Sequence, residues 1–569
     1  MKNFFSLIPA SQKYKIVLFF LLTIVLMILE SISIAIIIPF LSFIIDGDIN
    51  NLPYGNHFNL FLDLFEFKNL LIFLTLLILI VYIFKNIFLI YIRWWSYNFV
   101  NHLVYNLETR LFENYIKQKY FKVISLNSAE KIRNIRHETS SFAKYLNCLI
   151  VIIIELMVFF GILFLIFLIY AWASLISLVV FASVTFLFYI ASKKLLIKWS
   201  EKKIFHSGKS MKGILEAFNA IKEVKIFKKE NFFIKNFSYH VKRALKFNTW
   251  FNTYNEVPKI FSEIIVIIFI CAFTIYMSAE GVSKKEILTS LALFAVATIR
   301  LLPSTTRIIS SMNVCKSALP SVDILANELK DETMNNENDL LKKDFLEIKE
   351  NIIFSDVSLT YPNQSLPILK NINFKINSGD MIGISGKSGS GKSTLINLLT
   401  GLIEPTSGKI FFDNKIMNDQ TKFNIGYISQ ETLLLDNTIK YNITFGEDES
   451  EFEEKKLLQA VKNADLEELI NSLENGLDTY IGEKGFKISG GQRQKIAIAR
   501  ALYTNSSILI FDEATNQIDE NTEIKIFENL RKISNEKTIF FVSHSLSLFS
   551  YCDRILEIKN NKINFIDKK

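Results

Sequence analysis

Residues 386–394 read Gly386-Lys387-Ser388-Gly389-Ser390-Gly391-Lys392-Ser393-Thr394. They follow a short apolar run at 381–385 and precede a run of helix formers that begins at Leu395. A strand, a glycine-rich turn and a helix start in this order form a P-loop, whose backbone N–H groups close around phosphates. In such a loop Lys392 reaches the β- and γ-phosphates, and the Ser393 hydroxyl ligates Mg²⁺. The sequence therefore predicts that residues 386–394 bind ATP together with Mg²⁺.

A second apolar run, 507–511, ends in the acidic pair Asp512 and Glu513. A carboxylate at the end of a strand beside a P-loop supports the Mg²⁺ ion, and its neighbour is placed to polarise the attacking water. We therefore expect Asp512 to serve the metal and Glu513 to be the general base. The alternative interpretation is a pair of solvated acids at a strand end.

A third motif, Ile488-Ser489-Gly490-Gly491-Gln492, lies between the first two and opens a helical run, 493–502. In this position it resembles the signature of ABC transporters, and six membrane spans ahead of the ATPase motifs resemble the exporter type of that family. The resemblance implies that ATP is held between the P-loop of one chain and the signature residues Ser489, Gly490, Gly491 and Gln492 of another. Because the chain has one of each, it implies a homodimer with two equivalent sites.

Other residues match the family's motifs one at a time. The resemblance implies that Tyr361 stacks on adenine, that Gln430 contacts Mg²⁺ and the attacking water, and that His544 holds the γ-phosphate. It also implies that Glu483 meets the coupling helices of the membrane domain. Two departures stand out: Ile488 replaces the usual Leu, and Asn516-Gln517-Ile518-Asp519 replaces the usual Ser-Ala-Leu-Asp. The second departure bears on communication between the two ATP sites.

Half of the 569 residues are apolar, and the long apolar runs gather in residues 15–310. A membrane span needs about 20 mostly apolar residues. We predict six spans, near 16–45, 70–98, 146–168, 171–192, 258–279 and 286–312. The expected fold is therefore a polytopic α-helical membrane domain of six transmembrane helices at 1–330, a linker at 331–347, and an α/β P-loop ATPase domain at 348–569.

Charge distribution orients these spans. Residues 99–145 carry eight Lys and Arg, and residues 193–250 carry fifteen, whereas residues 46–68 carry only Lys68. The positive-inside bias places the two basic segments in the cytoplasm and the 46–68 loop outside, and six spans then place both termini in the cytoplasm. We expect the chain to lie in the inner membrane of a bacterium. The net charge of +8 fits contact with anionic lipid, and no nucleic-acid-binding motif is present. We expect each basic segment to be a pair of helices joined near 125–138 or 218–230; these turns either press on the ATPase domain or are solvated.

Charged residues inside spans usually face a cavity or an opposite charge. The pattern around Arg300 and Arg307 resembles the sixth span of lipid-linked oligosaccharide flippases of the Campylobacter type, and Lys85 and Lys259 fall where those flippases carry cavity arginines. The resemblance implies a cavity for the pyrophosphate of a polyprenyl-linked glycan; the alternatives are snorkelling, or pairing with Glu30 or Glu263. Residues 57–65 are expected to form a short external amphipathic helix at the membrane surface. The same resemblance implies that this helix contacts the lipid tail, and the alternative is that it only packs on the bundle.

These features predict an ATP-driven flippase of a lipid-linked oligosaccharide that works by alternating access. Within the same class, the substrate is alternatively lipid A, a drug or a peptide. A regulatory ABC protein that gates a channel is the alternative from another class.

Overall fold

The computed structural model describes residues 7, 9–37, 40, 44, 70–125, 128–169, 171–281, 284–330, 348–361, 364–413, 415–417, 423–447, 452–482, 485–534, 536–543 and 548–566. For most of 171–193 and 284–299 it describes the backbone and not the side chains. The chain divides into two compact units, Met1–Gln118 with Val123–Asn336, and Lys119–Lys122 with Glu337–Lys569. The predicted linker at 331–347 lies outside the described residues.

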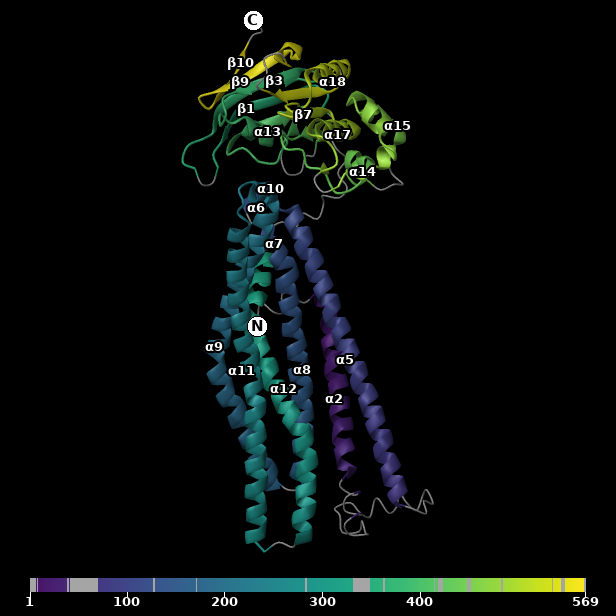
Figure 1. The fold of residues 1–569 in the computed structure, drawn as a ribbon, viewed down its shortest axis with the longest axis vertical. Helices are drawn as coiled ribbons and strands as arrows, with labels where there is room; N and C mark the ends of the chain where they lie inside the picture. Colours follow the sequence, from purple (N-terminus) through teal and green to yellow (C-terminus); the bar gives the residue numbers. More distant parts are fainter. Residues whose placement is uncertain are drawn as a thin grey trace. The chain divides into compact units, whose positions relative to one another are not determined.

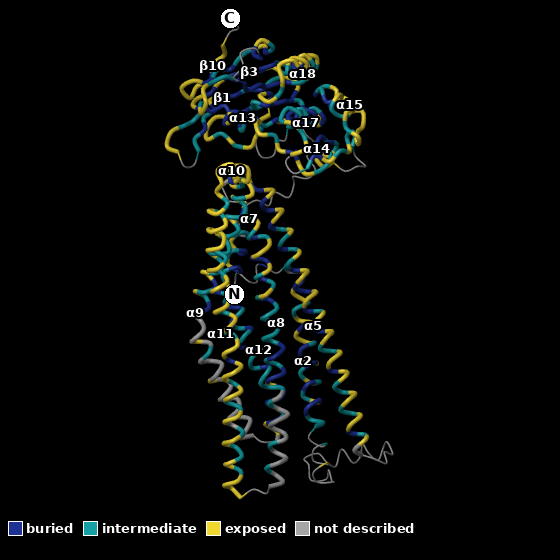
Figure 2. Tube along the Cα trace, in the orientation of Figure 1, coloured by how far each residue is buried: buried dark blue, intermediate teal, exposed yellow. Residues whose placement is uncertain are grey.

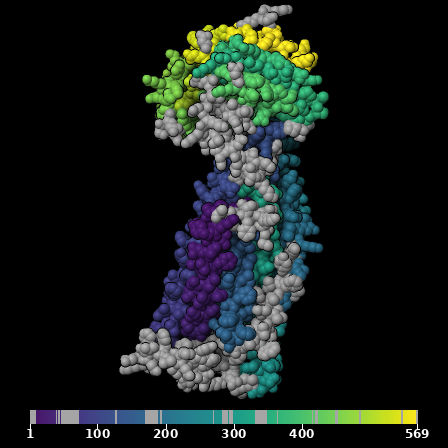
Figure 3. Space-filling model, turned by 180° about the vertical axis from the view of Figure 1, so that it is seen from behind, coloured from purple at the N-terminus to yellow at the C-terminus, as the bar shows by residue number. Residues whose placement is uncertain are grey.

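The described part of the first unit is helical (Figure 1). Together with α6, which the two units share, its elements are η1 (Ala10–Gln12), α2 (Lys13–Ala35), α5 (Leu70–Lys117), α6 (Tyr120–Ser125), α7 (Ser128–Arg133), the π-helical turn η2 (Asn134–Glu138), α8 (Thr139–Ile169), α9 (Ala171–Asn219), α10 (Ile221–Ile226), α11 (Glu230–Ala279) and α12 (Lys284–Lys330). Helix α8 packs against α12, α9 against α11, and α2 against both α5 and α8. The surfaces of α2 and α5 run side by side in Figure 3.

Four stretches of the described residues are long and apolar enough to cross a membrane: Lys13–Ala35, Ile72–Lys117, Ser128–Leu168 and Glu230–Ala279. They coincide with four of the six predicted spans, although α2 covers the first span, 16–45, only as far as Ala35. The spans predicted at 171–192 and 286–312 lie on α9 and α12, where most side chains of 171–192 and many of those before Arg300 are outside the description. The count of six therefore stays a prediction, and the expected helix at 57–65 also lies outside the described residues.

Several helices are much longer than a bilayer is thick. Helix α5 has 48 residues, which at 1.5 Å per residue makes it about 72 Å long, against a hydrocarbon core of about 30 Å. Helices α9 and α11 have 49 and 50 residues. The short helices α7 and α10 fall within the two turns expected near 125–138 and 218–230. The two basic segments are thus helical extensions of the spans.

Large apolar side chains are exposed along α5 and α11 (Figure 2). On α5 they include Ile80, Ile87 and Ile90, each more than three fifths exposed. Such faces are unfavourable in water, and they belong against lipid or against another protein chain.

The second unit is built on two sheets (Figure 1). An antiparallel sheet has the order β2-β1-β4-β5, and a six-stranded sheet has the order β10-β9-β3-β8-β7-β6. The strands are β1 (Asn351–Leu359), β2 (Leu369–Asn377), β3 (Met381–Gly386), β4 (Ser407–Phe412), β5 (Lys415–Ile416), β6 (Ile425–Ile428), β7 (Ile508–Asp512), β8 (Thr538–Val542), β9 (Arg554–Lys559) and β10 (Lys562–Ile566). The helices are α13 (Lys392–Leu399), α14 (Ile439–Thr444), α15 (Glu454–Asn463), α16 (Glu467–Ser472), α17 (Gly490–Tyr503) and α18 (Glu520–Ile533), with 3₁₀ turns η4 (Gly476–Asp478) and η6 (Leu548–Tyr551).

The central strands are buried on both faces, which explains their unbroken apolar sequences. Successive side chains of a strand point to opposite faces. Ile508 and Ile510 of β7 accordingly join the apolar cluster that includes residues of α13, whereas Leu509 and Phe511 join the cluster formed with α17 and α18. Strands β9, β3, β8, β7 and β6 all run parallel. Their carboxyl ends therefore share one edge, where the P-loop, Asp512 and the segment before Gln430 meet.

Candidate ATP site

The turn after β3 has a backbone that only glycine adopts easily. Gly386, Gly389 and Gly391 have φ values of +153°, +78° and +109°, in the region that side chains make unfavourable. A Cβ on Gly386 would lie 2.6 Å from Ser390 Oγ and 2.9 Å from the Ile558 carbonyl oxygen. The bare backbone of this turn leads into Gly391, the N-cap of α13, so the first N–H groups of that helix are available to an anion.

Two polar side chains in this turn are suited to phosphate. Lys392 is 8% exposed, and its Nζ donates to the carbonyls of Gly386, at 2.7 Å, and Lys387, at 3.4 Å. Ser390 Oγ is buried and has no hydrogen-bond partner among the described residues, and such a group is costly unless a ligand satisfies it. Ser393, at the start of α13, is exposed. These residues fit the phosphates of a nucleotide and its metal ion.

The acidic pair at the end of β7 is tied to two neighbouring segments. Tyr427, on β6, donates its hydroxyl to Asp512 Oδ2 at 3.1 Å. Gln430 Nε2 donates to Glu513 Oε2 at 2.7 Å. Glu513 has a φ of +52°, and its N–H donates to the Val542 carbonyl at 3.0 Å. The sequence predicted that Gln430 and Glu513 serve one site, and the structure places them in direct contact.

Burial is the largest influence on the Asp512 carboxyl and raises its pKa. The charge of Glu513 raises the pKa further, while the Tyr427 hydrogen bond and the charge of Lys392 lower it, and the net shift is upward. A divalent cation beside Asp512 favours the ionised form and opposes this shift. The raised pKa by itself disfavours the charged carboxylate.

Tyr361, the predicted adenine-stacking residue, lies next to the P-loop helix. Its hydroxyl is 3.4 Å from Thr394 Oγ1 on the first turn of α13. The ring is half-buried. The predicted residues His544 and Glu483 both lie outside the described residues.

Ser489 is the N-cap of α17 and forms a capping box with Gln492. Its Oγ accepts from the Gln492 N–H at 3.3 Å, and the Gln492 side chain accepts from the Ser489 N–H at 2.9 Å. Such boxes satisfy two free N–H groups and fix the helix start. In the part of the chain that is described, no hydrogen bond joins these signature residues to residues 386–394.

The unusual residue Gln517 packs on the signature. A Cβ on Gly490 would lie 2.2 Å from Gln517 Oε1, and one on Gly491 would lie 2.8 Å from the Gln517 carbonyl oxygen. The Gln517 N–H donates to Gln494 Oε1 at 3.0 Å. A cavity of about 310 Å³ adjoins these residues and is also lined by Gln430. Sequence comparison alone marked Gln517 as a departure but did not show that it covers the glycines of the signature.

Three of the four predicted substrate-binding bases are paired with buried acids. Arg300 and Lys85 both contact Glu30, Lys85 at 3.2 Å. Arg307 lies 2.8 Å from Glu155. Pairing with Glu30 was one of the alternatives open from the sequence, whereas the role of Glu155 was missed. Lys259 is exposed, and no acceptor for it is found among the described residues.

Part of this chain is similar in sequence to known proteins. Residues 369–516 match the family model described as ABC transporter. The "Probable multidrug resistance ABC transporter ATP-binding/permease protein YheI" of Bacillus subtilis is 39% identical over 232 residues, 40% of this chain and 39% of that protein. The "ATP-dependent lipid A-core flippase" of Mannheimia succiniciproducens is 38% identical over 234 residues, 40% of each chain. These matches span about two fifths of the length of the curated relatives.

A solved structure extends the likeness to the whole chain. The structure of a bacterial Atm1-family ABC exporter with ATP bound superposes with a TM-score of 0.76 over 98% of this chain and 95% of that one, at 19% sequence identity. The chain has the fold of an ABC exporter. This fold combines a helical membrane unit with a C-terminal ABC ATPase unit, as the sequence predicted.

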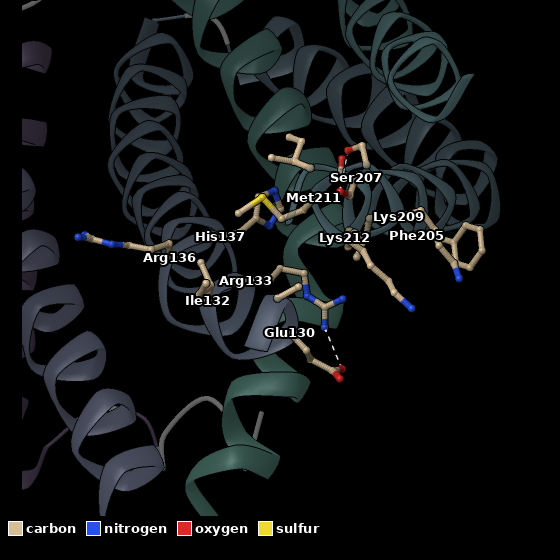
Figure 4. A pocket seen from close by; sticks show the side chains of 15 residues that line it. Glu130, Ile132, Arg133, Arg136, His137, Phe205, Ser207, Lys209, Met211 and Lys212 are labelled. Atoms are coloured by element: carbon tan, nitrogen blue, oxygen red, sulfur yellow. Dashed lines mark hydrogen bonds and ion pairs between the residues drawn. The ribbon is translucent and has the colours of Figure 1, made fainter. Parts of the chain in front are cut away.

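A second cavity of about 560 Å³ lies in the helical unit of this ABC exporter fold, between the α7–η2 segment and α9 (Figure 4). Its lining is rich in basic side chains: Arg133, Arg136, His137, Lys209 and Lys212. Glu130, on the rim, lies 3.4 Å from Arg133. The residues that line the cavity belong to the two basic segments.

The contact between Gly490 and Gln517 gives a testable expectation. Gly490→Ala should lower ATP hydrolysis about tenfold or more, because its Cβ collides with the Gln517 amide and shifts the start of α17. Adding Gln517→Ala removes the colliding Oε1 and Cδ atoms and should restore part of the lost rate. Phosphate release by wild type, both single variants and the double variant measures the coupling between the two sites. If the double variant were no faster than Gly490→Ala, the contact would not be the cause.

Proposed function

We propose that this chain is one protomer of a homodimeric ABC exporter in a bacterial inner membrane, with both termini in the cytoplasm. It hydrolyses ATP with Mg²⁺ and moves a polyprenyl-pyrophosphate-linked oligosaccharide across the membrane by alternating access. The observation that carries the ATPase part is the meeting of Lys392, Asp512, Glu513 and Gln430 at one sheet edge, within an exporter fold.

In this proposal each residue has one task in hydrolysis. The N–H groups of residues 386–394 and Lys392 bind the phosphates, and Ser393 and Asp512 hold Mg²⁺. Tyr361 stacks on adenine. Glu513 takes the proton of the attacking water, which Gln430 orients through the 2.7 Å contact between them. His544 holds the γ-phosphate.

The homodimer is supported by the single P-loop and the single signature of the chain, between which no hydrogen bond is found among the described residues. In the proposal a second copy completes each site. The exposed apolar faces of α5 and α11 supply further surface for lipid or for that copy. ATP binding draws the two ATPase units together, and hydrolysis releases them.

The charges within the predicted spans support an anionic substrate. Lys85, Arg93, Arg300 and Arg307 are balanced by only Glu30 and Glu155 in the contacts described, while Lys259 and Glu263, four residues apart on α11, add one charge of each sign. A pyrophosphate between a lipid and a glycan matches this surplus. Lipid A also carries anionic groups, and the relatives named as lipid A-core flippases make it the second candidate.

The test is ATP-driven flipping of a fluorescent polyprenyl-pyrophosphate oligosaccharide in proteoliposomes, for wild type and Glu513→Gln. Flipping that requires ATP and disappears in the variant supports the proposed substrate. ATP hydrolysis without flipping of this lipid contradicts it, and the same vesicles are then assayed with lipid A and with an uncharged drug.

Lys259 is the cleanest probe of substrate charge, because removing it leaves no buried acid without its described partner. Lys259→Gln should slow flipping of the pyrophosphate lipid about tenfold while ATP hydrolysis without substrate stays unchanged. Lys242→Gln makes the same charge change on an exposed residue of the same helix and should behave as wild type. Equal loss in both variants would show a general charge effect in place of recognition.

A further inference from the structure

Two buried acids, each held by two bases, lie between the membrane-spanning helices. Glu30 on α2 contacts Lys85 on α5 and Arg300 on α12. Glu155 on α8 contacts Arg307 on α12 at 2.8 Å and Arg93 on α5 at 3.7 Å. The two acid side chains are only 2% and 1% exposed. We call these groups the Glu30 cluster and the Glu155 cluster.

Each cluster has one more positive than negative charge. In the Glu30 cluster, Arg300 Nε is buried without a hydrogen-bond partner among the described residues. In the Glu155 cluster, the side chains of Arg307 and Arg93 are 48% and 26% exposed, so part of each guanidinium faces away from the acid. Both clusters therefore retain N–H donors for a further anion, although Glu30 and Glu155 already make the closest contacts with these bases.

The clusters are separated along the helices. Lys85 and Arg93 are eight residues apart on α5, and Arg300 and Arg307 are seven apart on α12, which corresponds to a backbone rise of about 10–12 Å along each helix. A pyrophosphate, with two phosphorus atoms joined by one oxygen, is too short to span that distance. It can engage one cluster at a time.

We propose that Glu30 and Glu155 are internal counter-anions that compete with the substrate's pyrophosphate for these bases, so that the two clusters form successive stations for it. The inference rests on the proposed substrate class. A cation buried without an anion is strongly unfavourable. Each carboxylate neutralises its bases when the site is empty, yields them to the phosphate oxygens, and takes them back when the substrate moves on.

The proposal predicts the direction of an affinity change. Glu30→Gln and Glu155→Gln keep the side-chain shape but remove the competing charge. Each variant should bind a pyrophosphate lipid about tenfold more tightly than wild type, and should flip it more slowly because release is no longer assisted. Loss of a substrate-binding residue would have the opposite effect on affinity.

Binding is measured on the full-length dimer in lipid nanodiscs with fluorescent polyprenyl pyrophosphate, and with the neutral polyprenol as the reference ligand. Mg²⁺ and ADP at saturation keep the probe from the ATP sites. Glu280→Gln, an exposed acid at the end of α11, is the matched control and should bind as wild type. Ser304→Ala serves if a Gln variant does not fold: it removes the 2.7 Å bond from Ser304 to Glu155 without changing charge, leaves the carboxylate more dependent on Arg307 and Arg93, and should weaken binding by a smaller factor.

Tighter binding of the charged lipid alone, in the Glu30 or Glu155 variants, supports the inference. Unchanged or weaker binding by the Glu30 and Glu155 variants overturns it. Equal binding of the pyrophosphate and the neutral polyprenol by wild type overturns it as well. Flipping by wild type is scored separately: ATP-driven flipping by wild type without tighter binding by the variants leaves the proposed function standing and removes the counter-anion role. Tighter binding by the variants without flipping by wild type leaves the counter-anion role standing and contradicts the proposed function.

Discussion

Glu513→Gln is expected to lower steady-state ATP hydrolysis by about a hundredfold or more and to leave ATP binding intact. Glutamine has nearly the same shape as glutamate, so the backbone bond from residue 513 to the Val542 carbonyl, at 3.0 Å, should remain. Its amide cannot accept a proton from water. Only the step that needs a base is therefore removed.

Release of phosphate and equilibrium binding of a fluorescent ATP analogue measure the two properties separately. Glu528→Gln on α18 is the matched control, because Glu528 is exposed and belongs to the same ATPase unit. Hydrolysis by the Glu513 variant at more than a tenth of the wild-type rate would assign the base to another residue. Loss of ATP binding would show instead that Glu513 supports the structure of the site.

The ATPase fold was predictable because its information is local. The apolar runs at 381–385 and 507–511 are strands β3 and β7, and each ends at a polar motif. Glycine positions in 386–394 have positive φ values, as the predicted phosphate-binding turn requires. A strand, a turn and a helix in sequence order therefore specified this part of the site without knowledge of distant contacts.

Contacts between distant segments were not predictable in the same way. Nothing in the sequence pairs Tyr427 with Asp512, 85 positions away, or Arg307 with Glu155, 152 positions away. Both pairs depend on which helices and strands become neighbours. The need to balance buried charge is general, and it indicated that the bases inside spans have acidic partners without showing which acid each would choose.

The membrane unit was likewise predictable in part, because its candidate spans could be predicted from the sequence and its contacts between helices could not. Length and apolar composition predicted the four candidate spans found among the described residues, since the bilayer imposes both properties. The substrate is specified by side chains from several helices. Here the structure changes the expectation: Lys85, Arg300 and Arg307 are engaged with acids, and Lys259 is the base without a described acceptor.

The composite ATP site leads to the second large effect. If each site joins the P-loop of one protomer to the signature of the other, then the arrangement of two lesions in a dimer decides its activity. Lys392→Ala removes the phosphate-binding amine, and Ser489→Arg fills the signature with a bulky cation. Either change should stop a site that contains it, by about a hundredfold or more.

Two mixed dimers with the same lesions are therefore expected to differ strongly in ATP hydrolysis. With Lys392→Ala in one protomer and Ser489→Arg in its partner, both lesions fall in one composite site and the other site is intact. With both changes in one protomer and a wild-type partner, each site contains one lesion. Co-expressed protomers with two different affinity tags, purified on both tags in sequence, give each mixed dimer for a phosphate-release assay. The first dimer should retain measurable hydrolysis and the second should have almost none, whereas sites formed within single chains predict the reverse order.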